Sequence, residues 1–173
     1  SLRATPAVWI EDVQVYPASS NNELRVVARI GNATGRAGAG EMSVLYNHCA
    51  TQRRRTGLPQ RLLALPVQWS AGGATVDFKC PLPQGKLGLW DEFDPVLHPL
   101  VFQLSTGDAK SVAVGLREIS TQGTQFLING RKTFFRGTLE CGIFPLTGHP
   151  PTDVESWKRI IRIAKAYGLN LFR

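Results

Sequence analysis

Short hydrophobic runs separated by turn residues fill the first 120 positions of the chain. They are rich in β-branched and aromatic residues and lie at residues 13–15, 24–30, 42–46, 62–69, 74–78, 100–104 and 112–119. Short strands at this spacing, without a helical period, are typical of an antiparallel β-sandwich of about 100 residues. The pattern therefore predicts a mainly β fold, with an immunoglobulin-like two-sheet sandwich over residues 1–120. Pro66 has no N–H for a ladder, which predicts that its strand lies at a sheet edge or contains a bulge.

A hairpin is expected directly after the sandwich. Residues 126–128 and 132–136 are strand-like runs, and Asn129 and Gly130 lie between them. A type I′ turn requires positive φ angles at both central positions, and the Asn-Gly pair tolerates them. The sequence therefore predicts that the chain reverses at these two residues.

The stretch from residue 152 to residue 168 changes to a helical period. Apolar residues at spacings of three and four form one stripe, which contains Val154, Trp157, Ile160, Ile161, Ala164 and Tyr167. Thr152 and Glu155 have the spacing of a capping box, and Gly168 is placed to follow the helix as its C′ residue. We expect the helix to bury Trp157, Ile161 and Ala164.

A parallel strand pair is expected around this helix. Residues 133–136 precede it, and residues 169–173, which are apolar at 169, 171 and 172, follow it, so the three elements form a βαβ unit with a right-handed crossover. One such unit leaves two sheet edges and both faces of the strand pair uncovered, whereas parallel strands occur almost only inside larger covered sheets. We therefore expect the sequence to be a piece of a longer protein whose second domain begins after residue 120.

The charge of the chain does not indicate a nucleic-acid partner. The net charge is +7, and residues 116–173 hold nine basic and four acidic side chains. The basic run Arg53, Arg54 and Arg55 lies among Thr and Gly, without a zinc finger, an RNP-type motif or an arginine-rich arm. We interpret this run as a solvated turn.

No membrane, metal or cofactor motif is present in the sequence. No segment approaches the roughly 18 apolar residues of a membrane span, and the first residues lack the core of a signal peptide, so no compartment is assigned. Cys49, Cys80 and Cys141 allow at most one disulfide, of unknown pairing, and none forms a C-x-x-C motif. His48 and His98 have no second ligand at metal-binding spacing.

Four segments resemble motifs of one protein family, in the family's order. Residues 89–102 resemble its LW-x-P-x-x-P-x-LY segment, residues 114–119 its GFR-x-I strand, residues 126–137 its F-x-LNGKP-x-x-x-RG segment and residues 168–173 its G-x-N-x-x-R strand. The chain therefore resembles glycoside hydrolase family 2, which contains β-galactosidases, β-glucuronidases and β-mannosidases. Residues 1–85 fit this family only by being β-rich in the right place.

The resemblance implies a two-part organisation. Residues 1–120 would be the family's immunoglobulin-like domain, and residues 121–173 the truncated start of its (β/α)8 barrel. A retaining glycosidase needs two carboxylic acids about 5–5.5 Å apart, and the family is implied to carry them after the fourth and seventh barrel strands, beyond Arg173. The chain alone is therefore expected to be inactive, although the longer protein would act on carbohydrate. Residues 138–142 replace the Asn and His-Glu pair of β-galactosidases, so neither the sugar nor the linkage is assigned.

Two residues receive roles from the resemblance. The Arg that the family has at the position of Arg173 is implied to keep the nucleophilic carboxylate ionised through a charge-assisted pair. Glu140 lies in the loop after the first barrel strand, where barrel active sites form. It is a candidate for binding sugar hydroxyls, or else a surface residue paired with an Arg. Asn170 is expected to be a structural hydrogen-bonding residue, and His149 a helix-entry residue.

An alternative function is a freestanding β-sandwich module for carbohydrate binding or adhesion. Aromatic rings stack on sugar faces, and Trp9, Trp69 and Trp90 could supply such a surface. Core packing is the more common role of a Trp in a sandwich, and we favour it for Trp69 and Trp90.

Overall fold

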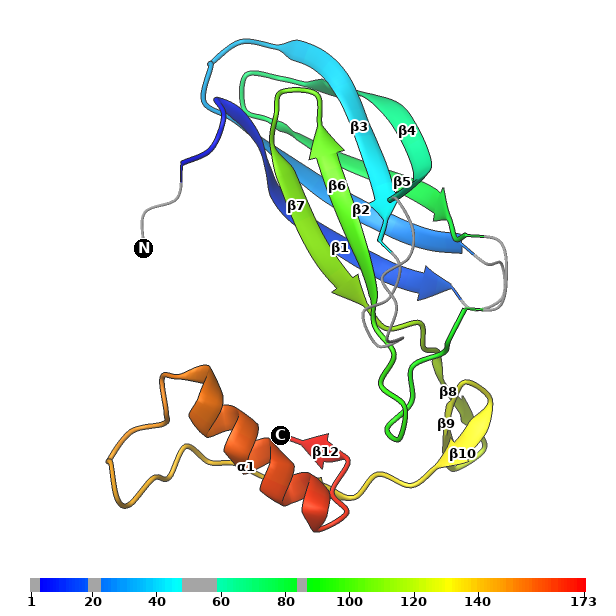
Figure 1. The fold of residues 1–173 in the computed structure, drawn as a ribbon, viewed down its shortest axis with the longest axis vertical. Coiled ribbons are helices and arrows are strands. Elements are labelled where there is room, and N and C mark those ends of the chain that lie inside the picture. Colours follow the sequence, from blue (N-terminus) through cyan, green and yellow to red (C-terminus); the bar gives the residue numbers. More distant parts are fainter. Residues whose placement is uncertain (1–3, 19–22, 48–58, 84–86) are drawn as a thin grey trace. The chain divides into compact units, whose positions relative to one another are not determined.

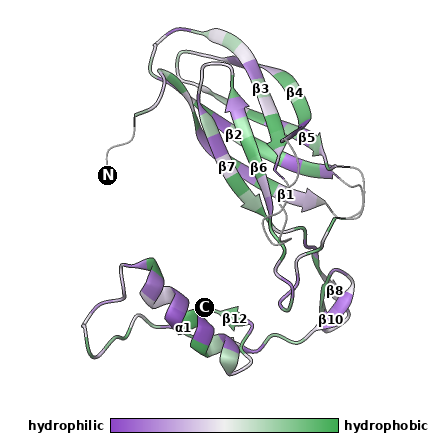
Figure 2. Ribbon diagram, viewed as in Figure 1, coloured by the Kyte–Doolittle hydropathy of each residue, from purple (hydrophilic) through white to green (hydrophobic). Residues whose placement is uncertain are grey.

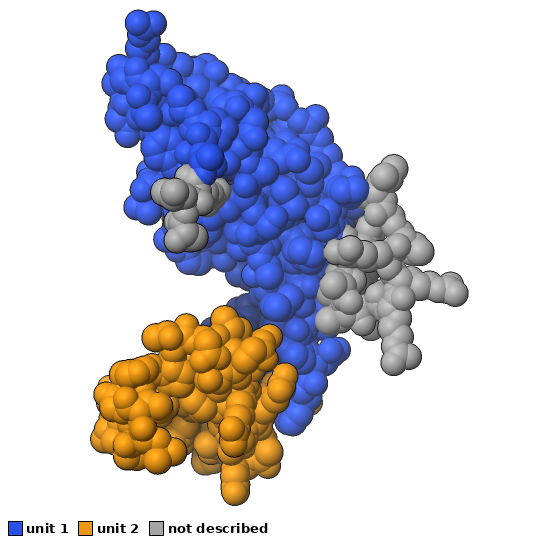
Figure 3. Space-filling view, turned by 60° about the vertical axis from the view of Figure 1, so that its left-hand side comes forward, with its two compact units in different colours: residues 1–120, 128–130 blue, residues 121–127, 131–173 orange. Residues whose placement is uncertain are grey.

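The fold is given by a computed structural model, which describes residues 4–18, 23–47, 59–83 and 87–173. The chain divides into two compact units (Figure 3). The first contains residues 1–120 and 128–130, and the second contains residues 121–127 and 131–173. Each unit is described by itself below.

The first unit is a sandwich of two antiparallel sheets (Figure 1). One sheet has the order β1-β2-β5, with strands at Val8–Ala18, Glu23–Asn32 and Ala74–Pro81. The other has the order β4-β3-β6-β7, with strands at Gln60–Trp69, Gly38–Tyr46, His98–Leu104 and Ala109–Val114. The mainly β class and the two-sheet sandwich are confirmed, and the described part of the chain before residue 120 contains no helix.

The core of the sandwich follows from the alternation of its strands. In β2, Leu24, Val26, Ala28 and Ile30 are buried at every second position, because successive side chains point to opposite faces of a sheet. Figure 2 shows the same alternation of hydrophobic and hydrophilic residues along the sandwich strands. The inner faces of the two sheets close one hydrophobic cluster, in which Phe102 of β6 is fully buried.

Two local features of the described strands bear on the sequence predictions. Pro66 lies in β4, which pairs with β3 and stands at the edge of the described sheet, as its missing N–H predicts. The expected run at residues 112–119 is not one strand. It is divided between β7, which ends at Val114, and β8, which begins at Ile119.

The predicted hairpin is present. Strands β8, β9 and β10, at Ile119–Gln122, Gln125–Ile128 and Arg131–Thr133, form a sheet of order β10-β9-β8. The reversal between β9 and β10 occurs at Asn129 and Gly130, whose φ angles are 52° and 74°. Both central residues of the turn therefore have the positive φ of a type I′ turn.

The second unit contains a parallel strand pair and a helix. The helix, α1, spans Val154–Ala166, and the short strands β11 and β12 at Gly137–Thr138 and Leu171–Phe172 are paired in parallel. The expected strand at residues 133–136 is therefore wrong by a few residues. Thr133 ends β10 of the hairpin instead, and the pairing of the first strand starts after the Arg136 carbonyl, which accepts from the Leu171 N–H.

The ends of α1 confirm one predicted signal and correct another. The N-cap is Asp153, whose carboxylate accepts the Ser156 N–H at 2.8 Å, so the predicted capping box of Thr152 and Glu155 is wrong. An Asp at this position satisfies a free N–H of the first turn as well as a Thr does. Gly168 has a φ of 76° and donates to the Lys165 carbonyl, which confirms it as the C′ residue.

The predicted buried face of α1 is only partly closed. None of the residues of α1, all of which the structure describes, is buried. Trp157 and Ala164 are half-buried and Ile161 is exposed, so the prediction that all three are buried is wrong. Trp157 contacts Phe172 of β12 (ring centroids 6.4 Å apart), which places this face of α1 against the strand pair (Figure 1).

Candidate functional site

The ends of β11 and β12 bring the two predicted site residues together. The Arg173 N–H donates to the Thr138 carbonyl at 3.0 Å, and the Glu140 N–H donates to the Arg173 carbonyl at 2.8 Å. These bonds continue the parallel ladder past both strands. Glu140 and Arg173 are therefore neighbours at the carboxyl ends of two adjacent parallel strands, where the loops of a barrel form its active site.

The opposite ends of the same strands are joined through Asn170. Its side-chain oxygen accepts the Arg136 N–H at 2.7 Å, and its amide nitrogen donates to the Phe134 carbonyl at 3.1 Å. The Arg136 side chain also donates from Nε to the Gly168 carbonyl at 2.7 Å. The expectation that Asn170 is a structural residue is consistent with these bonds, because its side chain connects the entry of β12 to the entry of β11.

Glu140 is held in a tight turn of the loop that follows β11. Its carboxylate accepts the Gly142 N–H at 2.7 Å, and Gly142 has a φ of 71°, which favours glycine. The Glu140 side chain is half-buried. A carboxylate has two oxygens with several lone pairs. The Glu140 carboxylate can therefore accept hydrogen bonds from a ligand's hydroxyl groups in addition to the one from the backbone N–H.

The neighbouring candidates do not converge on Glu140. His149 is exposed and its Nδ1 lies 2.9 Å from the Pro150 carbonyl, close to the start of the helix. Cys141 is exposed and Cys80 is buried, and both are free thiols. Burial raises the pKa of the Cys80 thiol to about 11. Cys49, His48 and the run at residues 53–55 lie outside the described residues.

An aromatic cluster beside the strand ends was not singled out from the sequence. Trp157 of α1 contacts Phe144 of the loop and Phe172 of β12 edge to face, with ring centroids 6.1 and 6.4 Å apart. The Trp157 Nε1 also donates to the Pro151 carbonyl at 2.8 Å. The helical stripe signalled that Trp157 faces inward, but no periodicity relates it to a loop residue such as Phe144.

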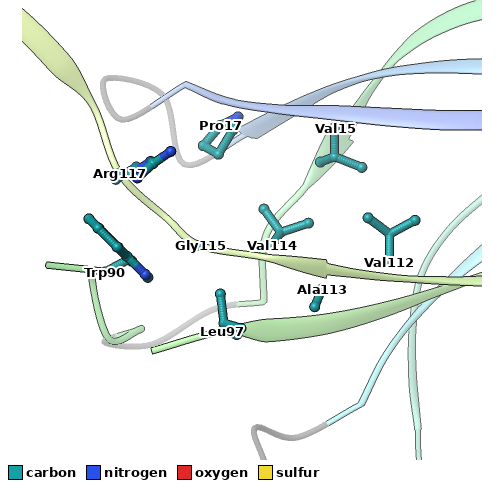
Figure 4. Close-up of a pocket in the computed structure, with 9 residues that line it drawn as sticks. All are labelled: Val15, Pro17, Trp90, Leu97, Val112, Ala113, Val114, Gly115 and Arg117. Atoms are coloured by element: carbon teal, nitrogen blue, oxygen red, sulfur yellow. The ribbon is translucent and has the colours of Figure 1, made fainter. Parts of the chain in front are cut away.

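The first unit has a hollow of about 340 Å³ beside the end of β7 (Figure 4). Its lining residues are mostly apolar: Val15, Pro17, Trp90, Leu97, Val112, Ala113, Val114, Gly115 and Arg117. The Arg117 guanidinium lies 4.5 Å from the centroid of the Trp90 ring, and a Cβ at Gly115 would come within 3.0 Å of the same side chain. The Arg117 guanidinium therefore covers part of the Trp90 ring, which is half-buried and lines the hollow.

Asn129 of the hairpin turn forms hydrogen bonds with the segment around Trp90. The Asn129 side chain donates to the Trp90 carbonyl at 2.9 Å and accepts the Glu118 N–H at 2.9 Å. Trp69 is buried, and Trp9 covers Gly31, where a Cβ would come within 2.4 Å of the ring. Burial bears out core packing for Trp69, whereas Trp9 and Trp90 are half-buried.

The histidine that the structure buries has a structural role. His98 Nε2 lies 2.8 Å from the Gly88 carbonyl, and Nδ1 lies 3.0 Å from the Tyr46 hydroxyl. A carbonyl oxygen only accepts, so Nε2 carries the proton and, in the neutral ring, Nδ1 accepts from Tyr46. Within the described ranges, no three His, Cys, Asp or Glu side chains are grouped so that they could hold a metal ion. No helix in those ranges is long and apolar enough to span a membrane.

Comparison with known proteins gives one sequence relative and several related structures. No protein-family model matches the chain. A β-galactosidase from Staphylococcus xylosus is 33% identical over 85 residues, which are 49% of this chain and 8% of that protein. This chain therefore spans only a small part of the curated relative that it matches.

The solved structures match almost the whole chain at low sequence identity. A family 2 β-galacturonidase from Eisenbergiella tayi, bound to galacturonate, is 21% identical with a TM-score of 0.75 over 96% of this chain and 28% of its own. A β-glucuronidase from Bacteroides uniformis is 19% identical with a TM-score of 0.75 over 97% of this chain and 21% of its own. At these identities the likeness shows the fold.

The structural and the sequence comparisons both find glycosidases. The match to the solved enzymes covers both described units, and the β-galactosidase adds a sequence relation over about half of the chain. The resemblance to glycoside hydrolase family 2 that the four motifs carry is confirmed.

Proposed function

We propose that this chain is part of a family 2 glycoside hydrolase that cleaves β-linked sugars with retention of configuration. Residues 1–120 form its immunoglobulin-like domain, and residues 121–173 begin its (β/α)8 barrel. The observation that carries this proposal is the β11–α1–β12 unit, in which Glu140 and Arg173 follow adjacent parallel strands at their carboxyl ends. In barrel enzymes these ends form the active site.

The chemistry assigns different roles to the two residues. Arg173 carries a permanent positive charge, which stabilises the ionised form of a neighbouring carboxylate nucleophile and so lowers its pKa. The Glu140 carboxylate accepts hydrogen bonds from hydroxyl groups of the sugar. The acid and nucleophile of the retaining mechanism would both lie after residue 173, so the 173-residue chain supplies substrate binding and electrostatics but neither reacting carboxylate.

The substrate is proposed to be a β-linked sugar, with uronides and galactosides tested first. Galacturonate is bound in the related E. tayi enzyme, and the sequence relative is a β-galactosidase. The loop at residues 138–142 differs from the β-galactosidase motif, so the two substrate classes must be compared directly.

A panel of nitrophenyl β-glycosides tests the proposal. The longer protein that contains these residues should hydrolyse at least one β-galactoside, β-glucuronide, β-galacturonide or β-mannoside, and the 173-residue chain should hydrolyse none above background. Arg173→Ala in the longer protein should lower kcat/KM on the order of 10²–10³-fold, as the loss of a preorganised electrostatic group does.

The matched control is Arg173→Lys, which keeps the charge and should lose less activity. Turnover by the 173-residue chain that disappears in Glu140→Gln would contradict the assignment of the chemistry to residues after 173. A longer protein that is indifferent to Arg173→Ala would contradict the role of that residue alone.

A further inference from the structure

The loop that carries Glu140 contains few hydrogen bonds that would fix its position. Residues 139–153 form neither helix nor strand. The Thr147 and Gly148 N–H groups donate to the Phe144 carbonyl, and the Gly142 N–H donates to Glu140. These bonds shape local turns, but they join the loop only to itself.

Attachment of this loop to the rest of its unit is provided at two places. At its start, the Glu140 N–H donates to the Arg173 carbonyl. Further along, Phe144 contacts the edge of Trp157, and the Pro151 carbonyl accepts from Trp157 Nε1. The five residues from 140 to 144 are therefore fixed at one end by β12 and at the other by one side chain of α1.

Trp157 is less buried than a core residue, and its ring contacts come from two different segments. The side chain is half-buried on a helix without any buried residue, and its ring partners come from the loop and from β12. Phe172, the partner on β12, directly precedes Arg173. One indole thus connects the loop of Glu140 with the strand end of Arg173.

We propose that Trp157 is a positioning residue that holds the 139–153 loop against the strand ends and thereby sets Glu140 beside Arg173. This inference rests on the proposed function for its consequence, because Glu140 must bind sugar for its position to affect hydrolysis. The loop then holds Glu140 in place before a sugar binds. Without the Phe144 and Pro151 contacts, the turn from Glu140 to Gly142 loses its second anchor.

Hydrogen exchange measured by mass spectrometry on the 173-residue chain tests the attachment. Trp157→Leu should speed exchange of the Glu140, Gly142, Thr147 and Gly148 amides at least tenfold, while amides in the middle of α1 change less than twofold. Tyr167→Leu is the matched control, since Tyr167 is an aromatic residue at the opposite end of α1, away from the loop, and is 82% exposed. It should change neither set. Equal loop exchange in Trp157→Leu and the unaltered chain would overturn the proposal.

Two further variants keep the test decisive if Trp157→Leu unfolds the helix. Phe144→Leu removes the loop's side of the ring contact without altering α1, and it should speed the same loop amides. Trp157→Phe keeps a ring for Phe144 and Phe172 but loses the donor to Pro151, so it should restore most of the loop protection. Unchanged loop exchange in Phe144→Leu would overturn the proposal.

Kinetics of the longer protein separate positioning from simple stability. Trp157→Leu should raise KM several-fold with kcat within twofold of the unaltered enzyme, and Trp157→Phe should recover most of that loss. A loosened loop with unchanged KM would overturn the positioning role. Absence of glycosidase activity in the unaltered longer protein would instead refute the proposed function, and the exchange result would still decide whether Trp157 holds the loop.

Discussion

The sandwich and the β11–α1–β12 segment differ in how much of their hydrophobic surface is covered. In the sandwich, two sheets face each other, and residues such as Leu24, Met42 and Phe102 are completely buried. The helix α1 has an equally regular apolar stripe but no buried residue, and Val154 and Ile161 of that stripe are 68% and 47% exposed. The apolar side chains are therefore shielded from solvent in the sandwich and largely accessible to it in α1.

This difference shows that an amphipathic pattern and a closed core are separate properties. Two sheets can bury each other's inner faces, whereas one helix on a two-stranded sheet leaves the outer edges and the second face uncovered. Under the proposed function, the apolar side chains of the second unit pack against further barrel elements. The predictions below test the contrast between the two regions.

The largest effect is expected from cavity formation in the sandwich. Phe102→Ala should destabilise the sandwich by about 3–5 kcal/mol, because a fully buried aromatic ring is removed. Ile161→Ala, at a stripe position of α1 that is 47% exposed, should change the free energy of unfolding by less than about 1 kcal/mol. Urea unfolding of both variants measures the difference. Equal losses would show that α1 is packed as tightly as the sandwich.

The two free thiols in the described part of the chain should differ in reactivity, the sandwich thiol being the less reactive. The pKa of Cys80, about 11, is well above the value near 8.5 of a free Cys, so at pH 8 its thiolate fraction is lower on the order of 10²-fold. Exposed Cys141 should react with iodoacetamide in the folded chain, and Cys80 only after denaturation. Peptide mapping identifies the labelled residue. Labelling of Cys80 as fast as Cys141 would contradict the closed core.

Two glycines offer a smaller and closely matched contrast. A Cβ at Gly38 would lie 2.7 Å from Nε1 of the buried Trp69, so Gly38→Ala should cost about 1–3 kcal/mol through overpacking. A Cβ at Gly137 would meet Leu171 Cδ2 at 3.2 Å, but the Leu171 side chain is 47% exposed and can rotate away. Gly137→Ala should therefore stay within about 0.5 kcal/mol. Thermal unfolding compares the two variants, and a reversed order would contradict the prediction.

Acid should weaken both regions slightly and in the same direction. A hydrogen bond from Arg25 of β2 lowers the pKa of Asp77 of β5. A hydrogen bond from the Ser156 N–H lowers the pKa of Asp153 at the start of α1. Each carboxylate therefore stabilises the folded state above the ordinary Asp pKa of about 3.9, and this contribution is lost as the pH falls through the lowered value.

Each pH contribution has its own control. Asp77→Asn should flatten the acid dependence of sandwich unfolding, and Asp153→Asn should flatten that of α1 exchange, since Asn still caps a helix without titrating. Both carboxylates are exposed, so the effects are expected to be small. An unchanged acid dependence in both variants would contradict the assignment.

Local chemistry was sufficient to predict many elements from the sequence. The β-branched run at residues 24–30 identified β2, the missing N–H of Pro66 predicted an edge or a bulge for β4, and Asn129 with Gly130 identified the hairpin turn. Gly168 was identified as the residue that ends α1. Each of these signals depends on a residue's own conformational preference or on neighbours within one turn, which the sequence contains directly.

Positions that depend on competition or on distant partners were decided by the tertiary structure. Asp153 rather than Thr152 caps α1, because both can accept an N–H and the backbone path selects one. Residues 133–136 could extend as a strand, yet the pairing with Leu171 and Phe172 selected Gly137–Thr138. The sequence by itself predicted the sandwich, the hairpin turn and the helix, and it suggested Glu140 and Arg173. Only the tertiary structure placed those two residues together and brought Phe144 and Trp157 into contact, because contacts between residues far apart in the chain depend on packing that no local pattern encodes.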